Sequence, residues 1–241
     1  MKNEYAKMWT QMRKKEYKYN FYDKFLIKLI KKNLKNSKKS KILEVCCGDG
    51  NPFAKILTLK YDYFGIDISN HLISIAKNNY GKKKFKVGDA EKLNIKKKFD
   101  MIICFHSLWY LPGYLKSIDK MLKILKPNGC LIFDSLNKNN QNNIKDYKKI
   151  VSETKGFGKI KRVFKNFLKI IFKVGYTKWS NVIHQKLNDI QQINNIINNQ
   201  KIFTEVSLFG YIEKKKKIIK IESINNKKIN RCTKIIFKCK K

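Results

Sequence analysis

Apolar residues along this chain fall into two kinds of segment, short continuous runs and longer stretches with a helical period. The short runs, which predict strands, are residues 41–46, 61–68, 85–87, 99–105 and 130–133. The helical stretches between them are residues 52–60, 70–79 and the segment that carries Leu115, Ile118, Leu122 and Leu125. This last helix is predicted to stop at Lys126-Pro127-Asn128-Gly129. Strands that alternate with helices predict a parallel, doubly wound sheet.

Both ends of the chain depart from this alternation. Before the first strand, apolar residues from Tyr22 to Ile30 recur at helical spacing and predict an amphipathic helix that ends near Leu34. We therefore expect an N-terminal helical cap segment, residues 1–36, and a main domain, residues 37–241, with a helical insertion at about 137–185.

The insertion and the tail have their own patterns. We expect a loop at 137–150, a basic amphipathic helix at 159–174 and a second helix at 186–199. Three strand-like runs follow, at 202–212, 217–223 and 231–238, of which the last two are expected to form a terminal antiparallel pair.

Residues with candidate chemistry follow the predicted strands. Glu44 lies in the first strand before the Gly48-Asp49-Gly50 turn, Asp67 ends the second strand, and Asp89 follows the third. In an open α/β sheet, ligands bind outside the carboxyl ends of the strands. Three such acceptors suit the ribose hydroxyls, adenine amino group and ammonium group of an adenosyl ligand that carries an amino acid. The turn lacks the GxGxxG spacing of a dinucleotide site.

Four segments, in the same order, resemble the motifs of class I S-adenosylmethionine-dependent methyltransferases. ILEVCCGDG is similar to motif I of this family, YFGIDIS to its second motif, VGDAEKL to its third and LKPNGCLIF to its strand-five stretch. The resemblance covers about residues 41–135. It implies a Rossmann-like α/β fold with a mostly parallel seven-stranded sheet, an antiparallel C-terminal strand and a helical cap insertion.

The resemblance also implies roles for individual residues. The positions that correspond to the family's cofactor-binding residues are Glu44, Cys46, Gly48, Gly50, Asp67, Ile68, Asp89, Ala90 and Phe105. Of these, Glu44 and the glycines would contact the methionine end, Asp67 the ribose, and Asp89 with Ala90 the adenine. Cys46 departs from the pattern, since glycine is usual there. Cysteine is small enough to be tolerated, but we do not expect its backbone to take a conformation open only to glycine.

Two readings stay open for His106, which follows the fourth strand. It is either a general base or a histidine packed beside the cofactor site, because methyl transfer needs mainly in-line positioning. The candidate substrate-pocket residues are Trp109, Tyr110, Tyr176 and Trp179, for which ordinary core packing is the alternative. Asp134 and Asn137 follow the fifth strand, but no carboxylate follows the fourth, so no metal site is predicted.

Composition adds little about the substrate. The formal net charge is +37, but only three of the basic residues are arginine, the residue that usually makes bidentate phosphate and base contacts. Weak, non-specific polyanion binding is therefore expected, and the charge is only weak evidence for an RNA substrate. Helix 159–174 is either a lid over the substrate or a peripheral membrane contact. Six scattered cysteines without a CxxC pair and an N-terminus without an apolar core predict a cytoplasmic protein.

The sequence thus predicts a methyltransferase that acts on O, N or C of a small-molecule or lipid-like acceptor. Two alternatives remain: an RNA methyltransferase, and a non-enzymatic protein that binds S-adenosylmethionine and a partner. The first is disfavoured because CFHSLWYL stands after strand four, where an Asp/Asn-Pro-Pro-Tyr/Phe run would bind a planar amino group.

Overall fold

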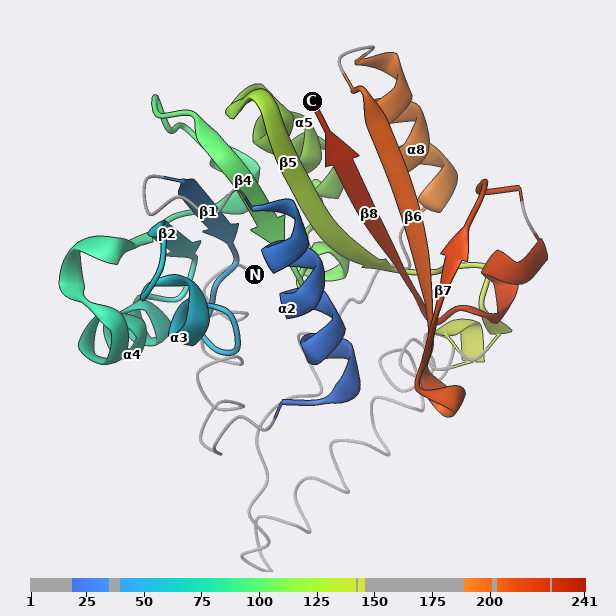
Figure 1. Ribbon diagram of the computed structural model, residues 1–241, viewed down its shortest axis with the longest axis horizontal. Helices are drawn as coiled ribbons and strands as arrows, with labels where there is room; N and C mark the ends of the chain where they lie inside the picture. The colour runs from blue at the N-terminus through green and yellow to red at the C-terminus, as the bar shows by residue number, and fades with distance from the viewer. Residues whose placement is uncertain (1–18, 35–39, 142, 146–188, 201–202, 226) are drawn as a thin grey trace, which may run out of the picture.

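The computed structural model of this protein describes residues 19–34, 40–141, 143–145, 189–200, 203–225 and 227–241. Within these residues, a single eight-stranded sheet has the strand order β3-β2-β1-β4-β5-β8-β6-β7, with helices on both faces (Figure 1). The chain order reverses between β1 and β4, so the carboxyl ends of these two strands flank the expected ligand crevice.

The first half of the sheet is parallel, as the alternating pattern predicts. Its strands are β1 (Lys41–Val45), β2 (Asp62–Asp67), β3 (Phe85–Val87), β4 (Phe99–Cys104) and β5 (Leu125–Leu136). The helices between them are α3 (Ala54–Leu57), α4 (Asn70–Tyr80) and α5 (Tyr114–Lys123). The predicted helix at 52–60 is thus reduced to a single α-helical turn.

The tail contributes three strands, β6 (Glu205–Ile212), β7 (Lys217–Ile221) and β8 (Lys234–Lys240). The predicted antiparallel C-terminal strand is confirmed, because β8 inserts between β5 and β6 and runs antiparallel to both. The prediction that 217–223 pairs with 231–238 is wrong. Strand β6 lies between these two runs and pairs with each of them, which gives eight strands instead of the predicted seven.

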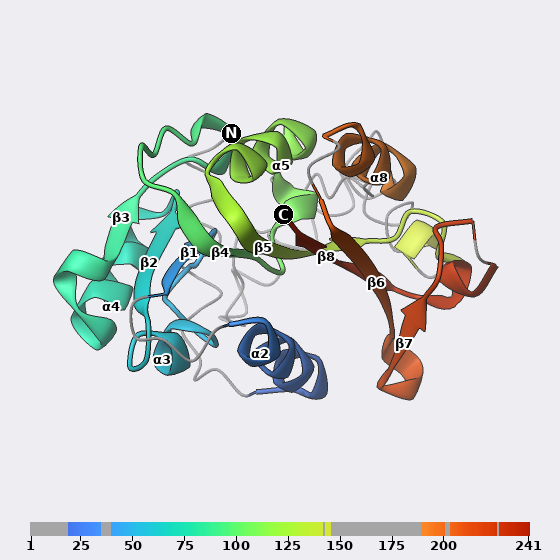
Figure 2. The same ribbon diagram turned by 45° about the horizontal axis from the view of Figure 1, so that its top comes forward.

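The two faces of the sheet are covered by different helices (Figure 2). Helices α2 (Phe21–Asn33), α3 and α4 lie on one face, while α5 and α8 (Ile190–Asn199) lie on the other. In α2, the fully buried Leu26 and Ile30 pack into the core beside Ile132 and Ile236 of the sheet. Burial of each such side chain contributes roughly 1.5–3 kcal/mol. Helix α2 is therefore part of the main core.

The stretch Lys126–Gly129, which was predicted to stop the helix before it, lies inside a strand. Helix α5 ends at Lys123, and β5 starts at Leu125, which pairs with Phe99 of β4. The next paired position joins Met101 to Cys130, so residues 126–129 bulge out of the ladder. Asn128 has a φ of 60° in this bulge. The turn signal was real, but it marks a bulge in the sheet.

Several expectations concern the insertion. Residues 141 and 143–145 are helical, so the predicted loop at 137–150 is wrong for these residues. The predicted helix at 159–174 lies outside the described residues, and only part of the insertion at 137–185 is described. Helix α8 confirms the helix predicted at 186–199. In the described part of the chain, no helix has the length and hydropathy needed to cross a bilayer.

Candidate active site

A cavity of about 190 Å³ opens at the carboxyl ends of β1, β2 and β4. Nine of the predicted site residues line it: Glu44, Cys46, Gly48, Asp67, Ile68, Asp89, Phe105, His106 and Tyr110. Gly50, Ala90 and Trp109 are not among the residues of its wall. Tyr176 and Trp179 lie outside the described residues. Strand ends that are far apart in the sequence therefore meet around one cavity, as the topology requires.

The turn after β1 forms one wall of this cavity. Gly48 has a φ of 55° and Gly50 a φ of 89°, and the Gly50 amide donates a 2.9 Å hydrogen bond to the Cys47 carbonyl. A Cβ on Gly50 would lie 2.8 Å from Cε2 of Tyr80 and 3.0 Å from Cβ of Ala54. Gly50 is therefore required for the shape of the turn, although it does not itself face the cavity.

Cys46 takes a φ of 62°, in the left-handed region that favours glycine. This region is strained for a residue with a Cβ but is not open only to glycine, so the observed backbone does not contradict the expectation for Cys46. Such a conformation costs about 1–2 kcal/mol for a residue with a Cβ. A hydrogen bond with Cys104, together with burial, raises the pKa of the Cys46 thiol well above its usual range. Burial does the same for the pKa of Cys47. These thiols therefore stay protonated and unreactive.

Asp67 connects the first two strand ends. Its Oδ2 accepts a 2.9 Å hydrogen bond from the amide of Gly48, and its Oδ1 accepts one of 2.9 Å from the amide of Ser69. These bonds fix the carboxylate against the turn and at the cavity wall. Replacement of Asp67 would therefore disturb the turn as well as any ligand contact.

Glu44 is the most enclosed of the three strand-end carboxylates, with only 4% of its surface exposed. The hydroxyl of Tyr63 donates a short hydrogen bond to its Oε2. Burial, together with the nearby Glu44 charge, raises the pKa of Tyr63 well above its ordinary value. Tyr63 therefore remains a donor, and it holds the Glu44 carboxylate in place.

The cavity also has a carboxylate to which the sequence assigned no role. Glu91 follows Asp89 in the short 3₁₀ turn Ala90–Lys92, and its amide donates a 2.9 Å hydrogen bond to Oδ1 of Asp89. Oε1 of Glu91 accepts a 2.8 Å bond from the amide of Gly113. Glu91 thus ties the third strand end to the start of α5. Nothing in its spacing distinguishes it from a surface glutamate.

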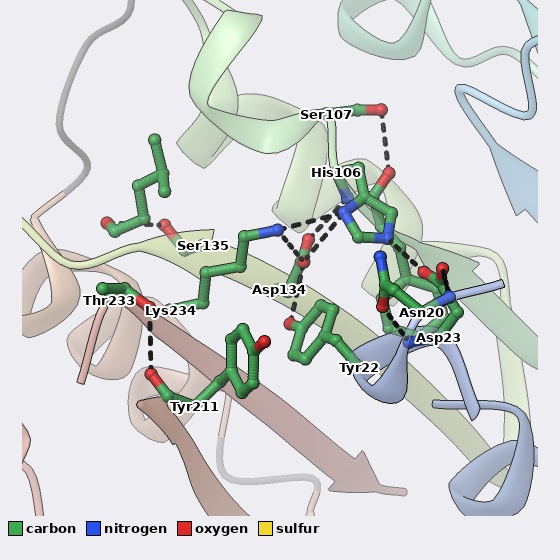
Figure 3. Close-up of polar contacts among 12 residues, drawn as sticks. Asn20, Tyr22, Asp23, His106, Ser107, Asp134, Ser135, Tyr211, Thr233 and Lys234 are labelled. Carbon is green, nitrogen blue, oxygen red and sulfur yellow. Dashed lines mark hydrogen bonds and ion pairs between the residues drawn. The ribbon is translucent and has the colours of Figure 1, made fainter. Parts of the chain in front are cut away.

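His106 lies at the end of β4, where it joins the cavity to a buried polar cluster (Figure 3). Its backbone has a φ of 58°, and its amide donates a 2.7 Å hydrogen bond to Oδ1 of Asp134 in β5. Oδ2 of Asp134 accepts a 2.9 Å bond from the hydroxyl of Tyr22 in α2. Burial raises the pKa of Tyr22 well above its ordinary value, with the Asp134 charge adding to the effect. Helix α2, the end of β4 and β5 are thus joined through one buried carboxylate.

Both ring nitrogens of His106 have partners (Figure 3). Nε2 lies 3.1 Å from Oδ1 of Asp23, and Nδ1 lies 3.1 Å from Nζ of Lys234. An ammonium group can only donate, so Nδ1 accepts from Lys234 and Nε2–H donates to Asp23. We refer to His106, Asp23, Asp134, Lys234 and Tyr22 as the His106 cluster.

Sequence reasoning found one member of this cluster as a site residue. Asp134 was considered only as a metal ligand together with Asn137, whose amide donates instead to the carbonyls of Ile229 and Cys232. Asp23 and Lys234 were missed because they lie 83 and 128 residues from His106 in the chain. Within the described residues, no three His, Cys, Asp or Glu side chains are grouped to hold a metal ion.

A family model described as "Methyltransferase domain" matches residues 36–185, which is more than half of the chain. The chain belongs to this family. The expected family, the class I S-adenosylmethionine-dependent methyltransferases, is thereby confirmed, and the fold agrees with it. A solved structure of an S-adenosylmethionine-dependent methyltransferase from Thermotoga maritima superposes with a TM-score of 0.60 at 13% identity, over 99% of this chain and 95% of that one.

Curated relatives share the methyltransferase domain over a shorter stretch. The chain is 34% identical over 125 residues to a ubiquinone biosynthesis O-methyltransferase from Pelagibacter ubique, which covers 50% of this chain and 51% of that protein. It is 29% identical to a malonyl-[acyl-carrier protein] O-methyltransferase from Calditerrivibrio nitroreducens, over 53% of this chain and 49% of that protein. The chain thus spans about half the length of the curated relatives it matches.

Proposed function

We propose that this protein is an S-adenosylmethionine-dependent methyltransferase that acts on a small-molecule acceptor. The observation that carries this proposal is the meeting of Glu44, Asp67 and Asp89 around one cavity, in a chain that belongs to a methyltransferase family. The named activities of the two curated relatives, both O-methyltransferases, support transfer to oxygen. Transfer to nitrogen or carbon remains the alternative.

The residues of the cavity fit this cofactor. Asp67 can accept hydrogen bonds from ribose hydroxyls, and Asp89 can accept one from an adenine amino group, with Ile68 against the ring. Glu44 supplies the negative charge for an ammonium group at the methionine end. When bound, the cofactor supplies a methyl group activated by a sulfonium. The protein's task is then to position the acceptor and exclude water.

The surroundings of the cavity complete the proposal. The helical insertion at 137–185, with the N-terminal segment, would close over the acceptor. Tyr110 lies on the cavity wall, as His106 and Ser107 do, and would contact the acceptor. The carbonyl of Phe105, which accepts a 2.9 Å hydrogen bond from the hydroxyl of Ser107, would add a second acceptor for the ammonium. Six unbridged thiols support a reducing, cytoplasmic setting.

Isothermal titration calorimetry with S-adenosylhomocysteine tests the cofactor site. Glu44→Gln is the sharpest variant, because the amide oxygen can still accept from Tyr63 while the negative charge is lost. We expect roughly a tenfold or greater loss of affinity, which is typical of a lost hydrogen bond between charged groups. Glu213→Gln, on an exposed turn, is the matched control and should bind like the unaltered protein. No binding by the unaltered protein, or equal affinity in both variants, would reject the proposal.

A second experiment identifies the acceptor. The protein is incubated with cofactor labelled in the methyl group and with a small-molecule metabolite extract, and the labelled product is identified by mass. Bulk RNA is offered in a parallel reaction. Label in the small-molecule fraction supports the proposal, whereas label in RNA alone makes the protein an RNA methyltransferase. Tight cofactor binding with no labelled product in either fraction favours a non-enzymatic binding protein.

A further inference from the structure

The helices on the two faces of the sheet carry different charge patterns (Figure 2). Helices α2, α3 and α4, on one face, contain a single acidic residue, Asp23, and its side chain is fully buried. All other charged side chains of these three helices are lysines. On the opposite face, α8 has no charged residue, and in α5 the carboxylate of Asp119 lies 2.7 Å from Nζ of Lys123. The helices of the α2 face therefore present positive charge and no exposed carboxylate.

The outer side of α2 is a narrow basic stripe that begins with an aromatic residue. The exposed residues of this helix, which we call the α2 stripe, are Phe21, Lys24, Lys28, Lys31 and Lys32. With 3.6 residues per turn, they fall within about 100° of the helix circumference, opposite the buried Leu26 and Ile30. Lysines three or four positions apart repel one another, which destabilises a helix. The stability of α2 therefore does not explain the stripe.

Helix α3 continues this surface. It lies beside α2 (Figure 1), and Leu57 of α3 lines the same small apolar crevice as Ile30 of α2. Lys55 of α3 and Lys60 of the turn that follows are both exposed. Between them, Leu59 is 81% exposed. An exposed apolar side chain therefore accompanies the lysines at α3 as well as at α2.

This combination fits an anionic bilayer better than a nucleic acid. Helices α2, α3 and α4 contain no arginine, the residue that makes bidentate contacts with phosphates and bases and stacks on bases. Phe21 is 47% exposed, and no nucleic-acid backbone contact uses such an apolar side chain. At an anionic bilayer, each lysine near the surface strengthens binding by roughly fivefold. Phenylalanine and leucine side chains add to this when they enter the boundary between headgroups and acyl chains.

The aromatic end of the stripe is close to the candidate active site. The hydroxyl of Tyr19 donates a 3.1 Å hydrogen bond to the carbonyl of Pro52, a residue of the cavity wall. Tyr19 precedes the N-cap residue Asn20, and Phe21 is the first residue of the helix. Phe21 therefore lies two residues along the chain from a contact with the cavity wall.

From these observations we propose that the α2 stripe, together with Lys55, Leu59 and Lys60, docks the protein onto an anionic phospholipid bilayer. The lysines face the lipid phosphates, while Phe21 and Leu59 enter the boundary between headgroups and acyl chains. The contact is peripheral, and its electrostatic part weakens as salt is added. This partner goes beyond the proposed function and does not depend on it, because docking requires no methyl transfer.

Sedimentation with unilamellar vesicles tests this surface. The full chain is mixed with vesicles of phosphatidylcholine alone, or of phosphatidylcholine and phosphatidylglycerol in equal amounts, at about 0.15 M salt. We expect binding to the mixed vesicles only. The triple variant Lys24→Gln, Lys28→Gln, Lys31→Gln should bind these vesicles about a hundredfold more weakly, since each lysine contributes roughly fivefold. If this variant does not fold, the single variant Lys28→Gln, with an expected loss of roughly fivefold, replaces it.

A charge-matched control shows whether the position of the lysines matters. The triple variant Lys96→Gln, Lys97→Gln, Lys116→Gln removes the same charge from exposed positions on α5 and on the loop that packs against it. It should lose less than about threefold in affinity for the mixed vesicles. The reason is that the thickness of a helix alone, about 10 Å, exceeds the distance over which charges act at this salt concentration.

Phe21 distinguishes a bilayer from other polyanions. Phe21→Ala should weaken binding to the mixed vesicles by roughly three- to tenfold, because part of an aromatic side chain no longer leaves water. Phe21→Trp should restore it. Val206→Ala, at an exposed apolar position of β6, is the matched control. Retention of bulk RNA on a filter should be the same for Phe21→Ala as for the unaltered protein.

Three outcomes would overturn the inference. The first is that the unaltered protein does not bind the mixed vesicles. The second is that both triple variants lose the same affinity, which would leave only the net charge. The third is that Phe21→Ala loses no more than Val206→Ala while the α2 triple variant loses as much RNA binding as vesicle binding, which would make the stripe a nucleic-acid surface. S-adenosylhomocysteine calorimetry is separate from all three, so a failure of the proposed function leaves this test unaffected.

Discussion

Replacement of Tyr22 by phenylalanine should destabilise the fold through a single lost hydrogen bond. Tyr22 is only 2% exposed, and its hydroxyl donates to Oδ2 of the fully buried Asp134 at 2.9 Å. Tyr22→Phe keeps the ring, which lies 4.6 Å from that of Tyr211, so the packing changes little. A hydrogen bond to a buried charge is worth about 1.5–3 kcal/mol. We expect a loss of about 2 kcal/mol, or about 4–8 °C in Tm for a chain of this size.

Urea unfolding followed by circular dichroism measures this loss. The measurement should give the same value from about pH 5 to pH 9, because burial raises the pKa of Tyr22 and a raised pKa leaves the protonated donor fully present below the ordinary tyrosine pKa of about 10. Tyr61→Phe is the control, since no hydrogen bond of its hydroxyl is found among the described residues. If Tyr22→Phe loses no more than Tyr61→Phe, Asp134 does not depend on this donor and the account of the His106 cluster is incorrect.

Three further predictions concern the turn after β1 and the base of the sheet. Cys46→Gly should leave the free energy of unfolding unchanged or raise it by up to about 1 kcal/mol, because glycine relieves the strain of the left-handed backbone and this offsets the lost thiol contacts. Urea unfolding measures the change, and a loss above about 2 kcal/mol would contradict the strain argument. Gly50→Ala should lower the free energy of unfolding by about 2 kcal/mol or more, because φ is 89° and the new Cβ would lie 2.8 Å from Tyr80. It should also weaken S-adenosylhomocysteine binding in calorimetry. Unchanged affinity and stability would show that the turn can shift. Burial opposes ionisation of Asp100, but hydrogen bonds from Lys126 and the Lys41 amide lower its pKa overall. The Asp100–Lys126 pair therefore stabilises the fold above the ordinary carboxyl pKa, and this contribution is lost as the pH falls. Lys126→Met should lower the free energy of unfolding by less than about 1 kcal/mol at pH 7 and leave it unchanged at about pH 2. An equal effect on the free energy of unfolding at both pH values would exclude this linkage.

The parallel half of the fold was predictable because local pattern and topology agree there. Buried parallel strands read as continuous apolar runs, and each run in residues 41–133 has the strand it predicts. The tail was harder to predict, because β6, β7 and β8 are all short apolar-rich runs and no local feature of the sequence indicates which of them pair. The order of these strands depends on which of them pairs with the free edge of β5. Strand β8 does so, through seven paired positions of β5 from Cys130 to Leu136.

The candidate site divides in the same way. Glu44, Asp67 and Asp89 were predictable because a parallel sheet brings the ends of its strands together, whatever the loops do. Asp23 and Lys234 were not, because their contacts with His106 depend on how α2 and β8 dock onto the sheet. Asp134 did carry a signal, since a carboxylate directly after the apolar run Cys130–Phe133 requires a buried partner. That signal indicated a polar contact without naming the partner.

The docking of α2 also links helix stability to the site. Oδ2 of Asp23 accepts a 3.1 Å hydrogen bond from the Asn20 amide, and the Asn20 side chain accepts one of 2.9 Å from the Asp23 amide, which together form a capping box. Oδ1 of the same Asp23 binds His106. One carboxylate therefore both starts the helix and sets the histidine ring, so fraying of the first turn would release His106. The division of the chain at residue 36 stays a prediction, but apolar side chains of residues 19–34 pack in the same core cluster as the sheet.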